Sequence, residues 1–259
     1  MSSLGRMMQH RSLNLELLDV CSLTKNKERT LKYQVNLIII IISTCIKMGS
    51  RIPPRPREEL SAKEQEDYDT FSCVKPHPFA TPCTNLVLSK QSEFGFGPNG
   101  SKFLYKDPKN GAFIGPYPFL LASGETGKMA LELVFSFAKI ASLLADVKET
   151  AILAVGGHFQ AAYELYAHEN VAVKSGALSQ EQVDAIKRDQ KPGDLSEECG
   201  LAYDVAKYLC SQKGPLPREE WERCVGAFGR EGTIALVHYV GFYAYLSIAL
   251  NAVDAPVPE

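Results

Sequence analysis

The segment VKETAILAVGGHFQAAYELYAHENVAVKSG, residues 147–176, contains two helical patterns separated by a pair of glycines. Apolar residues recur every three or four positions in 147–155 and again in 161–173, which is the period of an α-helix that buries one face. We interpret Gly156 and Gly157 as the end of the first helix. The segment therefore predicts two consecutive helices that can fold back on each other.

Further helical patterns lie on both sides of this segment. They cover about 61–73, 130–144, 201–210 and 230–253, with another short helix after Ser179. Ser61 is followed three positions later by Glu64, which is the pattern of a capping box at a helix start. Ser179 is followed in the same way by Gln182, and Pro217 is expected in a first helical turn after the break at KGPLP. No window alternates as a β-strand does, so we expect an all-α fold.

The chain is long enough for one helical core of ordinary size, and we expect a single domain over residues 48–259. Residues 1–47 are interpreted as a poorly integrated N-terminal extension, with translation beginning at Met48. The apolar run at 37–46 has about half of the ~20 residues needed to cross a bilayer, so we expect no membrane span there. Residues 75–118 carry repeated Pro, Gly, Asn and Ser, which predicts a long irregular wrap around the core. A loop of this length usually has a function or is loosely ordered, and the sequence does not decide whether it acts as a lid.

The composition is that of a soluble globular protein, with 45% hydrophobic and 22% charged residues. A formal net charge of −2 argues against a general nucleic-acid binder, because such a protein needs a basic surface. The seven cysteines include no CxxC pair, which argues against a zinc cluster or a dithiol redox centre. Widely spaced free thiols suit a reducing compartment, so we expect a cytoplasmic protein without a membrane partner.

The residues best suited to chemistry lie in the second helix of the opening segment. Glu164 and His168 are four positions apart, so both side chains lie on one helical face. A carboxylate in that position can orient the imidazole and favour its protonated form, which places a proton donor near neutral pH. If the two helices fold back on each other, Glu149 points at the same place. Such a pair is also common on ordinary helix surfaces, where it has no catalytic role.

Four residues near this pair are expected to bind substrate. They are His158, Tyr117, Tyr163 and Tyr166. The tyrosines can shape an apolar pocket, although aromatic residues in helices are more often part of the core. His158 follows the glycine pair on a face next to that of His168, and two histidines with a glutamate suggest zinc. Their spacing matches neither HExxH nor another metal motif, so we expect no metal.

The order of these motifs resembles the carboxymuconolactone decarboxylase and alkylhydroperoxidase-like families. The similarity lies in KETAILAV, a glycine break, YELYAH and AVKSGALSQEQVDAI, and extends to GPYPFLLASGE upstream and GFYAYLSIALNAV in the tail. It covers about residues 110–253. The resemblance implies a multi-helical bundle of the alkylhydroperoxidase-like type that forms a homo-oligomer, either a dimer, a trimer or a hexamer. The tail at 230–253 is apolar on nearly every face, which also favours burial in the core or against another subunit.

By position, the resemblance makes His168 the family histidine, Glu164 the glutamate four residues before it, and Glu149 a proton-relay partner. Alkylhydroperoxidase members carry a CxxC whose cysteines lie seven and four residues before the histidine. This chain has Ala161 and Glu164 at those positions. Without these thiols, a cysteine-dependent peroxidase is not expected.

We therefore expect a cofactor-free decarboxylase or related lyase that acts on a small carboxylated lactone or aromatic-derived acid. In this hypothesis His168 donates a proton, Glu149 relays or tunes it, and Glu164 orients the ring. The alternative is a non-catalytic oligomeric protein that binds a small molecule or acts as a scaffold, and it is favoured if Glu164 and His168 face open solvent. A thiol peroxidase would need a thiol from elsewhere, such as Cys199 or Cys210.

Overall fold

The computed structural model describes residues 50–72, 103–137 and 140–258. The chain divides into two units, Met1–Gly49 and Ser50–Glu259, and only the second is described below. The predicted N-terminal extension, the apolar run at 37–46 and residues 75–102 of the predicted loop lie outside the described residues.

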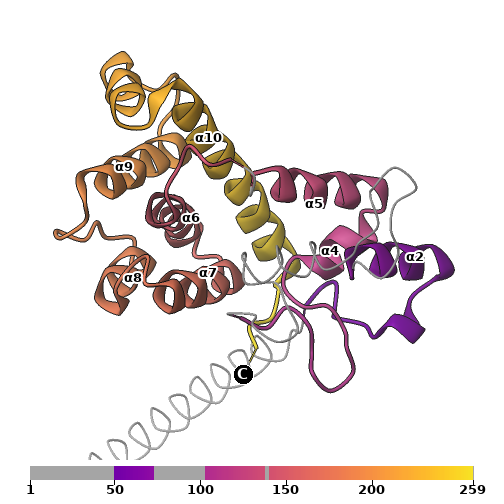
Figure 1. Ribbon diagram of the computed structural model, residues 1–259. Helices are drawn as coiled ribbons and strands as arrows, with labels where there is room; N and C mark the ends of the chain where they lie inside the picture. Colours follow the sequence, from indigo (N-terminus) through magenta and orange to yellow (C-terminus); the bar gives the residue numbers. More distant parts are fainter. Residues whose placement is uncertain (1–49, 73–102, 138–139, 259) are drawn as a thin grey trace, which may run out of the picture. The chain divides into compact units, whose positions relative to one another are not determined.

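Helices account for nearly all the regular structure of the described residues (Figure 1). They are the 3₁₀ turn η1 (Arg57–Glu59) and the α-helices α2 (Ala62–Phe71), α4 (Tyr117–Ala122), α5 (Glu125–Phe137), α6 (Ala145–Phe159), α7 (Ala162–Ser175), α8 (Gln180–Lys187), α9 (Glu197–Ser211) and α10 (Arg218–Val253). Within the same residues, extended pairing is limited to one isolated bridge between Lys106 and Phe113. The predicted all-α class is confirmed for this part of the chain.

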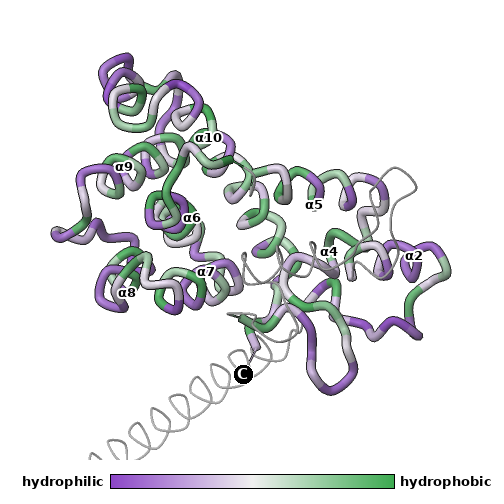
Figure 2. Tube along the Cα trace, in the orientation of Figure 1, coloured by the Kyte–Doolittle hydropathy of each residue, from purple (hydrophilic) through white to green (hydrophobic). Residues whose placement is uncertain are grey.

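Helix α6 forms the centre of the larger core. Figure 1 shows it nearly end-on, with α7, α8, α9 and α10 packed around it. Every residue from Glu149 to Gly157 is buried. A helix buried around its whole circumference has to be enclosed by other elements. The connection between α8 and α9, by contrast, is hydrophilic and lies at the edge of this group (Figure 2).

The glycine pair does not end α6, which corrects the prediction. The helix continues beyond the pair and ends at Phe159, and the C-cap residue Gln160 has a φ of 51°, in the left-handed region. A Cβ atom on Gly157 would lie 2.3 Å from the carbonyl oxygen of Ile186. One on Gly156 would lie 3.1 Å from a methyl carbon of Leu165. The glycines are therefore needed because α7 and α8 approach α6 closely, and not because the chain turns.

Both predicted capping boxes are present. The Ser61 hydroxyl accepts a hydrogen bond from the Glu64 N–H, and the Glu64 carboxylate accepts one from the Ser61 N–H. Ser179 and Gln182 make the same reciprocal pair at the start of α8. The helix predicted at 130–144 corresponds to α5, and both its ends lie nearer the N-terminus than predicted.

A second, aromatic core joins α2 and α4 to the loop between them. The ring of Phe113 lies 4.6 Å from that of Tyr68 and 4.9 Å from that of Tyr117, centroid to centroid. The ammonium group of Lys106 lies over Phe113, 4.4 Å from its centroid, where the ring attracts a cation. This packing holds Tyr117, and with it the start of α4, in place.

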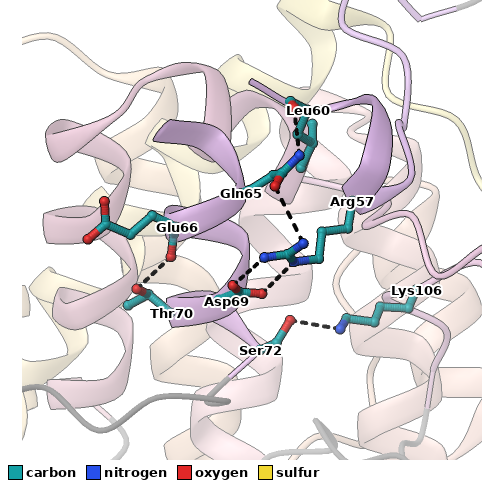
Figure 3. Close-up of polar contacts among 8 residues, drawn as sticks. All are labelled: Arg57, Leu60, Gln65, Glu66, Asp69, Thr70, Ser72 and Lys106. Atoms are coloured by element: carbon teal, nitrogen blue, oxygen red, sulfur yellow. Dashed lines mark hydrogen bonds and ion pairs between the residues drawn. The ribbon is translucent and has the colours of Figure 1, made fainter. Parts of the chain in front are cut away.

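Polar contacts fasten α2 to its surroundings (Figure 3). The Arg57 guanidinium donates to both carboxylate oxygens of Asp69, at 2.7 and 2.6 Å. Lys106, in the loop before α4, donates a hydrogen bond from Nζ to the hydroxyl of Ser72 at the end of α2, at 2.9 Å. Bidentate pairing of this kind adds geometric specificity, so η1 has a defined position against α2.

Helix α10 contacts both groups of helices. Pro217, which was predicted to lie in a first helical turn, is the N-cap residue of α10 and precedes that turn by one position. Gly229 has φ 68° and ψ 171°, so the helix is kinked there and the apolar tail begins at Arg230. Within the described residues, α10 alone is long and apolar enough to cross a membrane. About 56% of its most apolar stretch is buried inside the protein.

Candidate active site

One imidazole lies between two carboxylates where α6 packs against α7. His168 Nδ1 lies 2.8 Å from Glu149 Oε2 and donates a hydrogen bond to it. On the other side of the ring, His168 Nε2 lies 3.2 Å from Glu164 Oε1. Glu164 and His168 are one turn apart on α7, and Glu149 reaches them from α6. The structure therefore brings the three predicted catalytic residues together.

Glu164 Oε1 has no hydrogen-bond partner among the described residues. Its distance to His168 Nε2 is that of an ion pair, but the two groups are not aligned as in a hydrogen bond. Glu164 is only 4% exposed, so bulk water does not satisfy this oxygen. A buried polar atom left without a partner costs about 1–3 kcal/mol, and such atoms need a specific explanation. A ligand that meets Oε1 would supply one.

A cavity of about 60 Å³ lies beside this cluster, enough for a small organic group. Its walls come from α4, α5, α7 and α10, with Phe103 and Pro116 contributed by the loop before α4. Of its fourteen lining residues, nine are apolar, three are tyrosines, and the other two are Glu164 and His168. Glu149 is not among them and lies behind the imidazole. The cavity thus presents one carboxyl group and one imidazole to a bound molecule.

Burial and mutual contact shift the pKa values of this cluster. Burial raises the pKa of Glu164 to about 7, and the charge of His168 offsets only part of this effect. Burial by itself would lower the pKa of His168. The charge and hydrogen bond of Glu149, with the charge of Glu164, outweigh burial and raise it. Near neutral pH the cluster therefore holds protons on the imidazole and partly on Glu164, where a proton donor is useful.

Sequence reasoning missed Tyr243 of α10. Its ring meets the His168 ring edge to face, with centroids 5.0 Å apart and planes at 87°, and it lines the cavity. Tyr239 stacks parallel to it at 6.1 Å. Burial raises the pKa of Tyr243 well above its ordinary value, so it stays a neutral phenol. In the segment YVGFYAY at 239–245, Tyr239 and Tyr243 are four positions apart and so lie on one helical face. Nothing in the segment indicates that this face packs against α7.

The four predicted substrate-binding residues fall into two groups. Tyr117 and Tyr163 line the cavity. Tyr166 is not among the lining residues, and its hydroxyl accepts a hydrogen bond from the loop backbone. His158 also lies away from the cavity lining, with Nδ1 3.2 Å from Lys207 Nζ. The sequence analysis ended the first helix at the glycine pair and so put His158 on a face next to that of His168. In the structure, α6 continues through the pair and carries His158 at its own C-terminal end.

No thiol from the described part of the chain lines the cavity. Cys199, Cys210 and Cys224 are free, and burial raises the pKa of each, to about 11 for the last two. A raised pKa keeps each group a thiol at neutral pH and not the nucleophilic thiolate. Over the same residues, no group of three or more His, Cys, Asp or Glu side chains is arranged to hold a metal ion.

No protein-family model matches the chain, and no curated protein matches it. The resemblance to the carboxymuconolactone decarboxylase-like families therefore stands on the motifs in the sequence.

Proposed function

We propose that this protein is a cofactor-free enzyme of the carboxymuconolactone decarboxylase-like kind, with a helical bundle of the alkylhydroperoxidase-like type. Its reaction is the decarboxylation, or a related lyase step, of a small carboxylated lactone or aromatic-derived acid in the cytoplasm. The observation that supports it is the cluster of Glu149, His168 and Glu164 at the wall of an apolar cavity. The motifs suggest the class of reaction, and the cluster offers the proton transfer which that reaction needs.

The reaction consumes one proton and needs a group that accepts the electron pair of the broken bond. When the bond to the carboxyl carbon breaks, carbon dioxide leaves and the bonding electrons pass to an adjacent carbonyl group of the substrate. A proton from His168 then quenches the carbanion, so that R–COO⁻ and H⁺ give R–H and CO₂. Glu149 holds the Nδ1 proton and so keeps the ring in a fixed orientation. The apolar walls exclude water and strengthen these electrostatic effects.

The placement of four residues separates this proposal from a non-catalytic binding or scaffold protein. Glu149, Glu164 and His168 converge, and only His158 lies elsewhere. Glu164 and His168 lie at a cavity wall, and their side chains are only 5% and 14% exposed. This arrangement favours catalysis over binding alone. A thiol peroxidase is not favoured, because no described thiol lines the cavity.

We also propose that the protein is a homo-oligomer. Ile234, Val237, Tyr245 and Ile248 form a stripe along α10, which we call the α10 stripe, and are 37–56% exposed. Their spacing puts them on one helical face. Single exposed apolar residues are normal, but several aligned on one helical face are typical of subunit contacts. A second copy related by a two-fold axis would meet the stripe with its own.

The variant His168→Ala tests the proposed reaction. Carbon dioxide release is measured over a panel of small lactone carboxylates and aromatic acids. Because the variant removes the proton donor, kcat is expected to fall by about 10²–10⁴-fold. His158→Ala is the matched control, since that histidine lies outside the cavity lining, and it should keep wild-type turnover. Equal turnover by His168→Ala and the wild type would overturn the mechanism.

A further inference from the structure

The cavity offers no unpaired cation to a bound acid, because the charge of the His168 imidazolium is already balanced by Glu149. Among the described residues that line it, none is Lys or Arg, and His168 is the single basic group. Proteins commonly bind a carboxylate through Arg or Lys. Here a bound carboxylate would instead meet the carboxyl group of Glu164, with Glu149 on the other side of the His168 ring. Two carboxyl groups that share one site cannot both ionise without a large penalty.

Glu164 also carries the atom that can relieve this conflict. Its Oε1 is buried, lacks a hydrogen-bond partner among the described residues and belongs to a side chain that lines the cavity. When protonated, a carboxyl group donates a short, charge-assisted hydrogen bond to a carboxylate. One proton between two carboxyl groups removes their repulsion and also satisfies the unpartnered oxygen.

We propose that the cavity binds a monocarboxylic acid together with one proton, which is held between the ligand carboxylate and Glu164 Oε1. This inference rests on the proposed function, in which the substrate carries a carboxyl group. It adds that the substrate is recognised through a shared proton and not through a fixed cation. Binding of the ionised acid is then coupled to the uptake of one proton.

The titratable groups around Glu164 determine how firmly this proton is held. They are His168 and Tyr163 of α7, Glu149 of α6, Tyr117 of α4 and Tyr243 of α10. The α5 residues that line the cavity are apolar. Burial and the charge of Glu149 oppose ionisation of Glu164, and the charge of His168 favours it, which leaves the pKa at about 7. A carboxylate bound against Glu164 adds a further opposing charge and favours the protonated form.

The test compares isobutyrate with isobutyramide, which have the same shape and differ in charge. The Kd of each for the full chain is measured by NMR titration across the neutral pH range. For isobutyrate, Kd is expected to be constant below about pH 6.5 and to rise about tenfold per pH unit above about pH 7.5, because Glu164 must regain a proton. Isobutyramide needs no added proton, and its Kd should change by less than about twofold.

Glu164→Gln is the matched variant, because its amide also donates a hydrogen bond but does not titrate. Isobutyrate should bind to it with a Kd that is independent of pH. Glu132→Gln, at an exposed position of α5, should keep the wild-type slope. A wild-type Kd for isobutyrate that does not change above about pH 7.5 overturns the proposal without any variant. So does a failure of isobutyrate to bind at about 50 mM, which is weak even for a ligand of this size.

The binding test and the turnover test can fail independently of each other. If His168→Ala keeps full turnover, the catalytic mechanism fails, although proton-coupled binding by Glu164 can still be observed. If turnover depends on His168 but isobutyrate binds without proton uptake, only the recognition proposed here fails.

Discussion

The two carboxylates beside His168 differ in what each one faces. Glu149 contacts Nδ1 at 2.8 Å and lies behind the ring, whereas Glu164 lies at the cavity wall beside Nε2. From the sequence, we expected Glu164 to orient the ring and Glu149 to relay the proton. The geometry favours the reverse assignment, because an aligned hydrogen bond orients a ring and an unpartnered oxygen at a cavity is free to meet a ligand.

Glu149→Gln is expected to lower the pKa of His168, because the charge and the charged hydrogen bond that raise it are removed. The amide oxygen can still accept from Nδ1, so the ring should stay in place while kcat falls about tenfold or more. Two-dimensional NMR titration of the imidazole signals measures the shift. The signals of His158 provide an internal control in the same spectra. An unchanged pKa of His168 would refute the contact with Glu149.

The buried carboxyl group also affects stability. Because the pKa of Glu164 rises from 4.5 to about 7 on folding, the folded state keeps a proton that the unfolded chain has released between those pH values. The free energy of unfolding therefore falls as pH rises through that window, by about 3 kcal/mol at most. His168 acts in the same direction: its raised pKa adds stability below about pH 6.5 that is lost as pH rises through the folded value.

Glu164→Gln is accordingly expected to stabilise the fold by about 1–2 kcal/mol at pH 8, and to have little effect at pH 4.5, where the carboxyl group is protonated in the folded state. Urea denaturation at both pH values measures this difference. Glu132→Gln at an exposed position should change stability by less than about 0.5 kcal/mol at either pH. A variant that is no more stable than the wild type at pH 8 would contradict the burial effect.

Among the elements, α6 shows most clearly how packing overrides a local pattern. Its glycine pair has the appearance of a helix end, yet both residues are helical and buried. The neighbouring backbone of α8 excludes a side chain at Gly157. Further along the chain, Gly226 is also helical but exposed, with nothing within 4 Å of the position of an added Cβ. The two glycines therefore form a matched pair for testing helix propensity against packing.

Gly157→Ala is expected to destabilise the protein by about 1–3 kcal/mol, because overpacking against the Ile186 carbonyl outweighs the gain in helix propensity. Gly226→Ala should instead stabilise by about 0.5–1 kcal/mol, since only propensity changes. Denaturant midpoints with unchanged m-values measure both. If both alanines stabilised the fold, the close approach of α8 to α6 would be wrong.

At the scale of the whole molecule, α10 contributes to the cavity on one side and carries the α10 stripe on the other. Tyr243 and Leu246 line the cavity, while Tyr245 and Ile248 are exposed. The predicted apolar tail is thus not buried on every face within one chain. Its buried side is explained by the core, and its exposed side motivates the proposed oligomer.

Ile248→Arg is expected to shift the protein to a smaller assembly, because a charge placed in an apolar contact must be desolvated without a partner. Light scattering coupled to gel filtration measures the mass. Glu231→Lys, at an exposed position of α10 outside the stripe, should leave the assembly unchanged. A wild-type protein that is already monomeric at all concentrations would rule out the oligomer.

The sequence by itself determined the all-α class, both capping boxes and the alignment of Glu164 with His168, because each depends on contacts within a few residues of the chain. Only the tertiary structure decided that Glu149 reaches the same imidazole, that Tyr243 covers it and that His158 does not join them. These outcomes depend on the distance and rotation between packed helices. Side chains from distant parts of the chain determine both, so no local pattern reports them.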